Sequence, residues 1–377
     1  MAEIYRFSAP GRTEISGNHT DHQQGCVLAA AVNLETTAQV QLHPENCIRI
    51  FSQGYDPVEI WLDDLAVRPE ERNTTAALVR GVAAGFQQRG AKLQGFDAQV
   101  QSTVLPGSGL SSSAAFEVLM GTICNRLFLD PPLSPVEVAQ IGQFAENVYF
   151  GKPCGLMDQT TSAVGGMVFI DFADPDAPLV EPLDFDFSAT GYALCIIDSG
   201  ADHADLTEEY AAVPREMKAV AGYFGKTVLT QVPETDFYAA LPALRQAYGD
   251  RAILCCIHEY HENRRVRQQV AALKNGEFDR FLELVNESGR SSFMYLQNII
   301  PSGAVLHQEV AVALALCHSF LEGRGAFRVH GGGFAGTVQA FVPLDLLDTF
   351  VANMEAALGS GSCHVLQVRP QGGIQIS

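Results

Sequence analysis

Apolar and polar residues follow two different periods along this chain, and together they predict a mixture of strands and helices. Period-two alternation and short apolar runs mark strands, whereas apolar residues spaced three and four apart mark helices. The expected strands are 36–42, 96–104, 166–172, 192–198, 326–330, 337–343 and 364–369. The expected helices are 75–88, 112–127, 206–224, 262–273, 278–295, 305–321 and 346–357.

These elements alternate without the regular strand–helix–strand rhythm of a doubly wound sheet, which favours an α+β protein. A proline- and aspartate-rich stretch at 174–182 is the best candidate for a domain boundary. We therefore expect two domains, residues 1–182 and residues 183–377. A length of 377 residues is comfortable for two domains.

Charge narrows the possible partners. The 43 acidic residues outnumber the 24 basic ones, for a formal net charge of −19, and 47% of the residues are hydrophobic. Such acidity disfavours nucleic acid or an anionic membrane as the main partner, because phosphate backbones require a basic face. It leaves open a small phosphate-bearing ligand held by backbone N–H groups.

Cysteine usage and the first residues bear on location. Nine scattered cysteines contain no C-x-x-C pair, and most lie in apolar runs, which predicts reduced thiols in a cytoplasmic protein. The opening residues carry charges where a signal peptide would need its apolar stretch. The apolar window 304–320 is interrupted by histidines and Glu309, so we expect no membrane span.

The most informative segment is 106–115, which reads Pro-Gly-Ser-Gly-Leu-Ser-Ser-Ser-Ala-Ala. It places a glycine-rich turn and three serines between a strand and a helix. Such a loop offers unpaired N–H donors and the positive end of a helix dipole, both of which favour phosphate. An ordinary turn with a serine N-cap is the alternative. Glu117, just inside the helix, is expected to be a solvated helix charge.

Three further segments combine glycines with polar residues. The first reads Pro-Gly-Arg at 10–12 and Gly-Asn-His-Thr-Asp-His at 17–22, which suggests a polar site for a small ligand or, alternatively, part of a metal centre. The second contains Glu146 and then Cys-Gly-Leu-Met-Asp-Gln at 154–159, where Asp158 is either an N-cap or a buried acid with a partner. The third, the glycine loop at 331–336, is either a strand–strand turn or a wall against a ligand.

Taken together and in this order, the four segments resemble the galactokinases of the GHMP kinase superfamily. The segment at 10–21 is similar to the galactokinase signature, 105–115 to the superfamily's phosphate loop, 154–159 to the stretch with the catalytic aspartate, and 331–336 to the third motif. The resemblance implies a two-domain GHMP kinase fold, with an N-terminal ribosomal-protein-S5-like domain and a C-terminal ferredoxin-like domain, and the active site between them.

It also implies an ATP-dependent sugar 1-kinase, most simply one that converts galactose to galactose 1-phosphate, with Mg²⁺. Asp158 would be the base or orienting group, and Arg12 its partner. The residues implied to bind the sugar are Asn18, His19, Asp21, Gly155 and Tyr210. Those implied to bind the ATP phosphates are Gly107, Ser108, Gly109, Leu110, Ser111, Ser112, Ser113 and Ala114. The implied metal ligands are Ser112 or Ser113 with Glu146, and Gly331, Gly332 and Gly333 would line the domain junction. We expect a monomer or weak homodimer that binds neither nucleic acid nor membranes.

The chain departs from the galactokinase pattern mainly in the signature. Asn18 replaces the usual Glu, His22 replaces the usual Tyr, and residues 297–301 replace a Ser-Cys-Pro-Glu region. Because these changes concern the sugar side, phosphoryl transfer is a firmer expectation than galactose. The alternatives are the same chemistry on another hexose, such as galacturonate, and a non-catalytic sensor that binds sugar and ATP.

Overall fold

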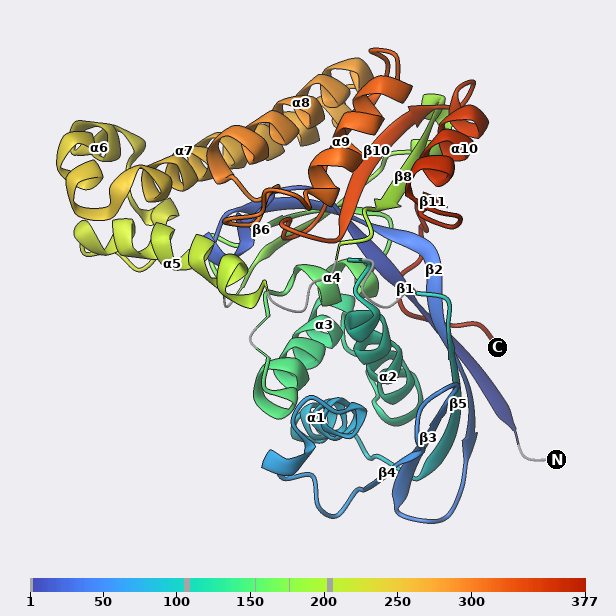
Figure 1. Ribbon diagram of the computed structural model, residues 1–377. Coiled ribbons are helices and arrows are strands. Elements are labelled where there is room, and N and C mark those ends of the chain that lie inside the picture. Colours follow the sequence, from blue (N-terminus) through green and yellow to red (C-terminus); the bar gives the residue numbers. More distant parts are fainter. Residues whose placement is uncertain (1–2, 105–108, 153, 176, 202–205) are drawn as a thin grey trace. The chain divides into compact units, whose positions relative to one another are not determined.

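The computed structural model describes residues 3–104, 109–152, 154–175, 177–201 and 206–377 (Figure 1). The chain forms two compact units, and neither is a continuous half. Unit 1 comprises Met1–Thr13, Ala30–Val168 and Val368–Ser377, and unit 2 comprises Glu14–Ala29 and Phe169–Gln367. We expected a single boundary at residue 182. The segment Glu14–Ala29 groups with unit 2 because side chains of that unit, such as Arg328 and Asn263, bond to it.

A twisted sheet and a layer of helices build unit 1 (Figure 1). The strand order is β12-β1-β2-β5-β3-β4. Its strands are β1 (Ile4–Ser16), β2 (Cys26–Leu42), β3 (Cys47–Ser52), β4 (Val58–Trp61), β5 (Phe96–Ser102) and β12 (Ile374–Gln375). Its helices are α1 (Thr75–Gln88), α2 (Ser112–Phe128), α3 (Pro135–Phe144) and α4 (Met157–Val164). A π-helix, Ala145–Phe150, follows α3 directly.

Helix ends in unit 1 follow local capping chemistry. The Thr74 side chain accepts a hydrogen bond from the Ala77 N–H at the start of α1. Ser134 and Glu137 form a reciprocal capping box at the start of α3. The sequence predicted α1 at both ends. It missed β1, because Pro10 and Gly11 in its middle disfavour a strand and its buried residues include the polar Ser8 and Thr13.

Unit 2 contains an antiparallel four-stranded sheet in the order β11-β8-β10-β9. Its strands are β8 (Tyr192–Asp198), β9 (Ala326–Val329), β10 (Thr337–Pro343) and β11 (Cys363–Leu366), and β6 (Met167–Asp171) pairs with β7 (Leu179–Leu183). Its helices are α5 (Thr207–Tyr223), α6 (Glu234–Ala239), α7 (Leu241–Lys274), α8 (Phe278–Ser291), α9 (Glu309–Phe320) and α10 (Leu347–Leu358). A π-helix at Ser292–Leu296 extends α8.

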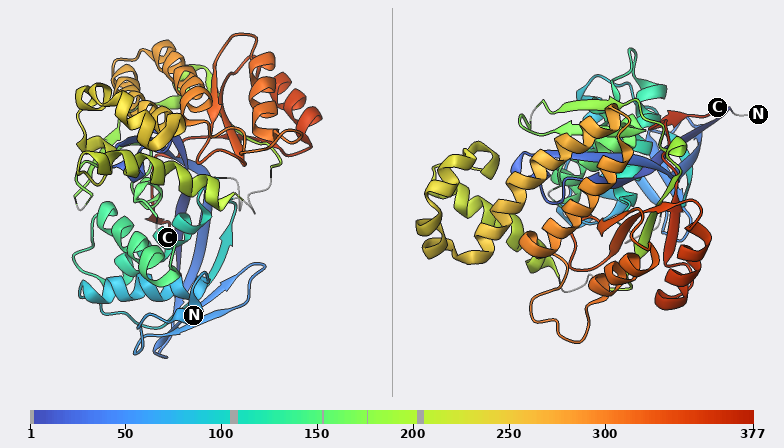
Figure 2. Two further views of the ribbon diagram at one scale, coloured as in Figure 1. Left: turned by 60° about the vertical axis from the view of Figure 1, so that its left-hand side comes forward. Right: turned by 90° about the horizontal axis from the view of Figure 1, so that it is seen from above.

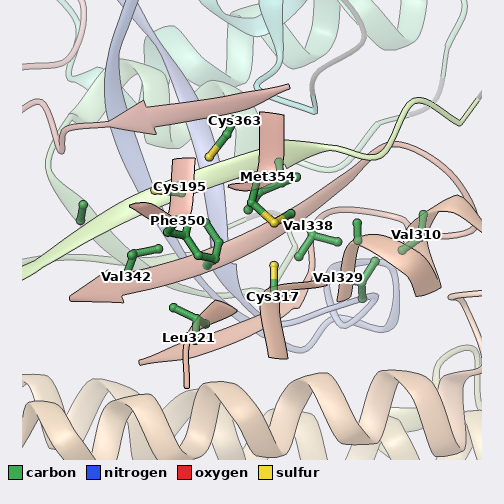
Figure 3. Packing of buried hydrophobic residues seen from close by; sticks show 14 of the residues in the cluster. Cys195, Val310, Cys317, Leu321, Val329, Val338, Val342, Phe350, Met354 and Cys363 are labelled. Carbon is green, nitrogen blue, oxygen red and sulfur yellow. The ribbon is translucent and has the colours of Figure 1, made fainter. Parts of the chain in front are cut away.

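The core of unit 2 has two parts. One lies between the four-stranded sheet and helices α9 and α10, where Cys195, Cys317, Cys363 and Met354 pack with Val and Phe side chains (Figure 3). The other joins α5 to α7. Helices α7 and α8 pack along each other (Figure 2). All nine cysteines are free thiols, and none of the described helices is long and apolar enough to cross a membrane.

Candidate active site

The ion pair expected between Arg12 and Asp158 lies in unit 1, where β1 positions Arg12 and α4 positions Asp158. Arg12 Nε donates to Asp158 Oδ1 at 2.7 Å, and Arg12 Nη2 donates to Oδ2 at 2.5 Å. Arg12 Nη1 also donates to the carbonyl of Gly109. The side chains are 12% and 29% exposed, so the pair is shielded but still reachable by a ligand. This bidentate geometry fixes the carboxylate as well as pairing its charge.

Arg12 decides the ionisation state of Asp158. Burial by itself raises the pKa of the Asp158 carboxyl, but the charge and hydrogen bonds of Arg12 outweigh it, helped by a hydrogen bond from Ser111. The net result is a pKa below the ordinary value. Asp158 is the second residue of α4, and Leu156 is the N-cap, so the capping interpretation of Asp158 does not apply.

The phosphate-loop candidate leads from Gly109 into α2. Gly109 and Ser111 both have positive φ, at 73° and 55°, and the Ser111 side chain makes no capping bond. The serine N-cap alternative is therefore not what this turn forms. Gly11 allows the close approach of β1, because a Cβ there would lie 3.0 Å from the Leu110 carbonyl. Ser112 and Ser113 begin α2, Leu110 and Ala114 are buried, and Gly107 and Ser108 lie outside the described residues.

A pocket of about 270 Å³ gathers most of these groups. Its lining residues are Arg12, Gly109, Ser111, Ser112, Ser113, Glu146, Lys152, Cys154 and Asp158. Lys152 Nζ lies 3.7 Å from Glu146 Oε1. The pocket therefore combines two cations, two carboxylates and three hydroxyls at the N-terminus of a long helix, which suits an anionic ligand with a bound cation.

Behind this pocket, Gln159 joins two acids. Its Nε2 donates to Glu146 Oε2 at 2.8 Å and to Glu117 Oε2 at 2.9 Å. Glu117 is 1% exposed, so the expectation of a solvated helix charge is wrong. Burial and the nearby Glu146 raise the pKa of Glu117 well above its ordinary value. The helical spacing of α2 gave no hint of this, because the neighbours of Glu117 come from α4 and the π-helix.

Sequence reasoning also missed a second pocket of about 650 Å³ in unit 1. It shares Ser112 and Ser113 with the first pocket. Its other lining residues are Thr36, Ser52, Gln53, Tyr55, Thr75, Leu78, Val100, Ser102, Val104, Phe116 and Phe150. Val79, which is fully buried in α1, and Trp61, which is exposed on β4, do not line it.

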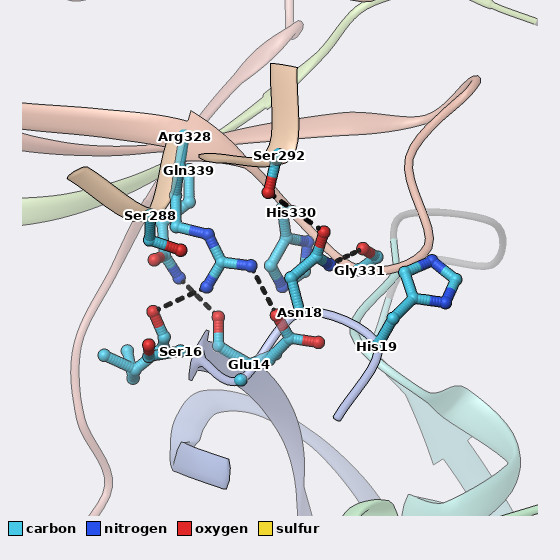
Figure 4. Close-up of polar contacts among 12 residues, drawn as sticks. Glu14, Ser16, Asn18, His19, Ser288, Ser292, Arg328, His330, Gly331 and Gln339 are labelled. Carbon is cyan, nitrogen blue, oxygen red and sulfur yellow. Dashed lines mark hydrogen bonds and ion pairs between the residues drawn. The ribbon is translucent and has the colours of Figure 1, made fainter. Parts of the chain in front are cut away.

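In unit 2, Asn18 of the signature lies inside the protein. Its side chain is fully buried between Ser292 and Gly331 (Figure 4). Nδ2 donates to the Gly331 carbonyl, while Oδ1 accepts from Asn298 Nδ2 at 2.8 Å and from Ser292 Oγ at 3.2 Å. These contacts are all with protein atoms. A direct contact between Asn18 and a sugar stays a prediction that these contacts do not support.

The two histidines of the signature form a hydrogen-bonded chain that ends on the glycine loop. His19 Nε2 lies 2.9 Å from the Gly332 carbonyl and must donate to it, because a carbonyl only accepts. His19 Nδ1 and His22 Nε2 lie 3.0 Å apart, within hydrogen-bond distance. Burial, with the nearby His19, holds the pKa of His22 well below its ordinary value, so His22 is neutral. Asp21 is half-buried, and its Oδ1 accepts from the His22 N–H.

The remaining expected sugar ligands occupy both units. Tyr210 of α5 donates from its hydroxyl to the Gly333 carbonyl at 2.7 Å, within unit 2. Gly155 is exposed in unit 1, just before α4. The loop Gly331–Gly333 joins β9 to β10, which confirms that it links two strands; lining a junction between domains stays a prediction.

Comparisons with known proteins agree with this reading of the motifs. The model of the GHMP kinases N terminal domain matches residues 77–166, and that of the galactokinase galactose-binding signature matches residues 2–42. The galactokinase of Streptomyces coelicolor is 32% identical over 375 residues, which cover 97% of this chain and 92% of that protein. The galactokinase of Actinobacillus pleuropneumoniae is 33% identical over 340 residues, with coverages of 89% and 84%.

Solved structures show the same fold. The crystal structure of Lactococcus lactis galactokinase complexed with galactose matches with a TM-score of 0.82 and 24% identity, over 99% of this chain and 95% of that chain. A mevalonate kinase structure matches with a TM-score of 0.69 at 12% identity, over 97% and 99%. The fold is therefore that of the GHMP kinases, and the chain belongs to the galactokinase family.

Proposed function

We propose that this protein transfers the γ-phosphoryl group of ATP to the C1 hydroxyl of galactose. The observation that carries the proposal is the bidentate Arg12–Asp158 pair beside the serine loop, in a chain of the galactokinase family. This is the arrangement that phosphoryl transfer requires: an oriented hydroxyl, a fixed cation and a phosphate cradle.

Asp158 is proposed to orient the C1 hydroxyl and to accept its proton. The sugar oxygen forms a bond to the γ-phosphorus, the bond from that phosphorus to the β–γ bridging oxygen breaks, and ADP leaves with that electron pair. Arg12 keeps Asp158 ionised, and its guanidinium also faces charge on the transferring group. Since the transition state of phosphoryl transfer is loose, orientation contributes at least as much as proton removal.

ATP binding is proposed to use both pockets of unit 1. The N–H groups at the start of α2 and the helix dipole attract the phosphates without many basic side chains, which fits a chain of net charge −19. The adjoining pocket of about 650 Å³ offers the apolar surface of Leu78, Phe116 and Phe150 to the adenosine. The two sites are continuous through Ser112 and Ser113.

The residues of the smaller pocket fit Mg²⁺. Glu146 and the hydroxyls of Ser112 and Ser113 line one cavity, and Mg²⁺ prefers such hard oxygen ligands together with phosphate oxygens. Gln159 occupies Glu146 Oε2, which leaves Oε1 beside Lys152. When bound, Mg²⁺ would neutralise phosphate charge. Glu146 and one serine would hold it, and Gln159 would keep the carboxylate in place.

On the sugar side, the proposal assigns His19, Asp21, Gly155 and Tyr210 to hydroxyl contacts. The alternative substrate galacturonate was based on Asn18, because a neutral residue in place of the usual Glu would not repel the carboxylate at C6. The side chain of Asn18 is fully buried and bonded to protein groups, so no described contact favours that sugar over galactose.

A coupled assay for ADP release tests the proposal. Purified full-length protein with ATP and Mg²⁺ should release ADP when galactose is added, and phosphorus NMR should identify a C1 phosphomonoester. Glucose, galacturonate and N-acetylgalactosamine serve as comparison sugars. If the protein turned over another hexose and not galactose, that hexose would be its substrate and the proposal of galactose would be wrong. ATP and sugar binding without turnover of any sugar would favour the sensor alternative.

A further inference from the structure

In the glycine loop of unit 2, the carbonyl groups of Gly331, Gly332 and Gly333 all accept hydrogen bonds from side chains. The Gly331 carbonyl accepts from Asn18, the Gly332 carbonyl from His19 and Asn298, and the Gly333 carbonyl from Tyr210. The loop is glycine-rich for steric reasons as well. Gly333 has φ +80°, and a Cβ there would lie 2.1 Å from the Asn298 carbonyl oxygen. The loop therefore depends on its contacts with residues 18 and 298 for its position.

Asn18 and Asn298 are at the centre of this arrangement, and they also bond to each other. Asn298 Nδ2 donates to both Asn18 Oδ1 at 2.8 Å and the Gly332 carbonyl at 3.0 Å. The backbone carbonyl of Asn298 accepts from the Phe334 N–H at 2.5 Å. Both asparagines are fully buried. They coincide with two places where the sequence departs from the galactokinase pattern, residue 18 and the segment 297–301, so the two departures are in direct contact.

The pocket around the Asn18 side chain is complementary to a neutral amide. It presents two donors, from Ser292 and Asn298, to Oδ1, and one acceptor, the Gly331 carbonyl, to Nδ2. The backbone carbonyl of Asn18 accepts from His258 Nε2 at 2.9 Å. Burial lowers the pKa of His258 to about 4, so its imidazole is neutral and brings no charge to this cluster. With an ionised aspartate at position 18, a carboxylate oxygen would face the Gly331 carbonyl oxygen, and neither atom could donate a hydrogen bond.

We propose that Asn18 and Asn298 are positioning residues that set the glycine loop and, through the Gly332 carbonyl, the ring of His19. They act on the sugar through the loop and His19, and Asn18 itself makes no sugar contact. This inference rests on the proposed function, in which His19 contacts the sugar. The two asparagines bond to each other as well as to the loop, so a change at either one alters the contacts of the other.

The first test measures the loop itself and needs no substrate. Amide hydrogen exchange of peptides covering 329–336 should be faster in Asn18→Ala and in Asn298→Ala than in the wild type, because the carbonyl contacts are lost. The matched control is Asn125→Ala. Asn125 is also a buried asparagine with two hydrogen bonds, both to Leu133 in unit 1. It should leave exchange at 329–336 unchanged. Unchanged exchange there in folded Asn18→Ala and Asn298→Ala would overturn the proposal.

The second test separates positioning from general damage. Asn18→Ala and Asn298→Ala should each raise the KM for galactose about tenfold, the cost of roughly one buried hydrogen bond, with the KM for ATP within about twofold. The double variant should cost less than the product of the two effects, because the residues share one contact. The proposal would be contradicted if the KM for galactose in the double variant rose by the full product of the two single effects, or if the KM for ATP rose as much as the KM for galactose.

Asn18→Asp gives the sharpest variant, since it keeps the shape and replaces the donor. Its carboxyl is expected to have a raised pKa, because it is buried beside a carbonyl. When protonated, it can again donate to Gly331. As the pH is lowered from about 8 to about 5.5, its KM for galactose should therefore fall towards the wild-type value. At each pH this KM is divided by that of Asn18→Ala, so that pH effects shared by both variants cancel. A constant ratio would count against the proposal.

Other charged or titratable groups also face this cluster, so the KM of Asn18→Asp must be compared with that of Asn18→Ala at each pH. These groups are His19 on the same turn, His258, Glu262 and Arg265 of α7, Arg328 of β9, and His330 after β9. The pKa of Glu262 is lowered to about 2 against the effect of burial, mainly by Arg265, so Glu262 does not titrate in this range. If the wild type turned over no sugar, the proposed function would fail, yet hydrogen exchange would still decide whether the two asparagines hold the loop.

Discussion

The ATP-side cluster of unit 1 and the signature cluster of unit 2 are both polar, but they are built from different chemistry. In unit 1, Arg12, Asp158, Glu146 and Lys152 line one small pocket as charged side chains. In unit 2, the side chains that hold the glycine loop are Asn18, Asn298, His19 and Tyr210, all of them amides, an imidazole or a phenol. Charged side chains line the pocket proposed for phosphoryl transfer, whereas amide, imidazole and phenol groups hold the loop.

This difference follows from the cost of burial. A buried charge requires a partner and good geometry, whereas a buried amide requires only matched hydrogen bonds. Of the charges in the pocket of unit 1, Lys152 is exposed and Asp158 is 29% exposed, so a ligand can reach them, whereas Glu146 is buried. Asn18 has no exposed surface. We therefore expect substitutions in the first cluster to change the rate and its pH dependence, and substitutions in the second to change sugar affinity.

Asp158→Asn should have the largest effect. It keeps the shape and the contact with Arg12 in part, but it removes the proton acceptor and the charge that orients the hydroxyl. We expect kcat to fall by about 10²–10⁴-fold, with the KM for ATP within about twofold. Steady-state ADP release measures this. The control is Asp250→Asn, which removes an exposed ion pair with Arg245 and should leave kcat unchanged. A residual rate within tenfold of the wild type would remove Asp158 from the chemistry.

Arg12→Met should have the next largest effect, and its size should depend on pH. In the wild type, Arg12 holds the pKa of Asp158 below its ordinary value, so Asp158 is ionised throughout the neutral range. Without Arg12, burial raises that pKa against only the hydrogen bond from Ser111 and the charge of Lys152. We expect kcat to fall by about 10²-fold at neutral pH, and the acid limb of kcat/KM to move to higher pH. A deficit that does not change with pH would mean that Arg12 acts on the phosphoryl group alone.

The lowered pKa of Asp158 also contributes to the pH dependence of the free energy of unfolding. Because the folded-state pKa of Asp158 lies below its unfolded value, the ionised carboxylate stabilises the fold above the unfolded pKa. That contribution is lost as pH falls through the folded-state pKa. Thermal unfolding of the wild type and of Asp158→Asn should therefore converge in acid. The comparison is informative only for this pair, since Arg12→Met changes both the charge and the packing.

The motifs predicted the two clusters unequally well. The resemblance to galactokinases, which rests on the ordered glycine segments, implied that Arg12 is the partner of Asp158, and the two are in bidentate contact. The sequence could not show that Asn18 is buried, because an asparagine looks the same facing a ligand or a carbonyl. Nor could it show that Asn298, 280 residues away, would be its partner. Short motifs report local chemistry, and a long-range pair leaves no periodic signal.

Elements were predictable where the residues give a clear apolar run or helical spacing. Helix α1 and strands β8 and β10 were predicted at both ends, whereas β1 was missed because Pro10 and Gly11 lie in its middle and its buried residues include polar ones such as Ser8. The large pocket beside Ser112 was unpredictable for a different reason. Its lining by Leu78, Phe116 and Phe150 has the composition of a core, and only the tertiary arrangement leaves it open.

The smallest and most discriminating effect concerns the two acids joined by Gln159. Glu146 lines the pocket, whereas Glu117 lies behind it, and burial and the nearby Glu146 raise the pKa of Glu117 well above its ordinary value, which favours its neutral form. Glu146→Gln should raise the Mg²⁺ concentration needed for half-maximal rate about tenfold or more, because a charged ligand is lost. Glu117→Gln introduces a neutral group of the same shape, and its amide oxygen can still accept from Gln159.

Mg²⁺ titrations of ADP release, with thermal unfolding of each variant, measure this difference. Glu117→Gln should leave the half-maximal Mg²⁺ concentration within about twofold of the wild-type value and the unfolding temperature unchanged or raised, because a buried acid has been removed. Equal shifts in both variants would show that Glu117 is ionised and shares the metal. In that case unit 1 would bury a charge without a cationic partner, and the contrast between charged and neutral clusters would hold only for unit 2.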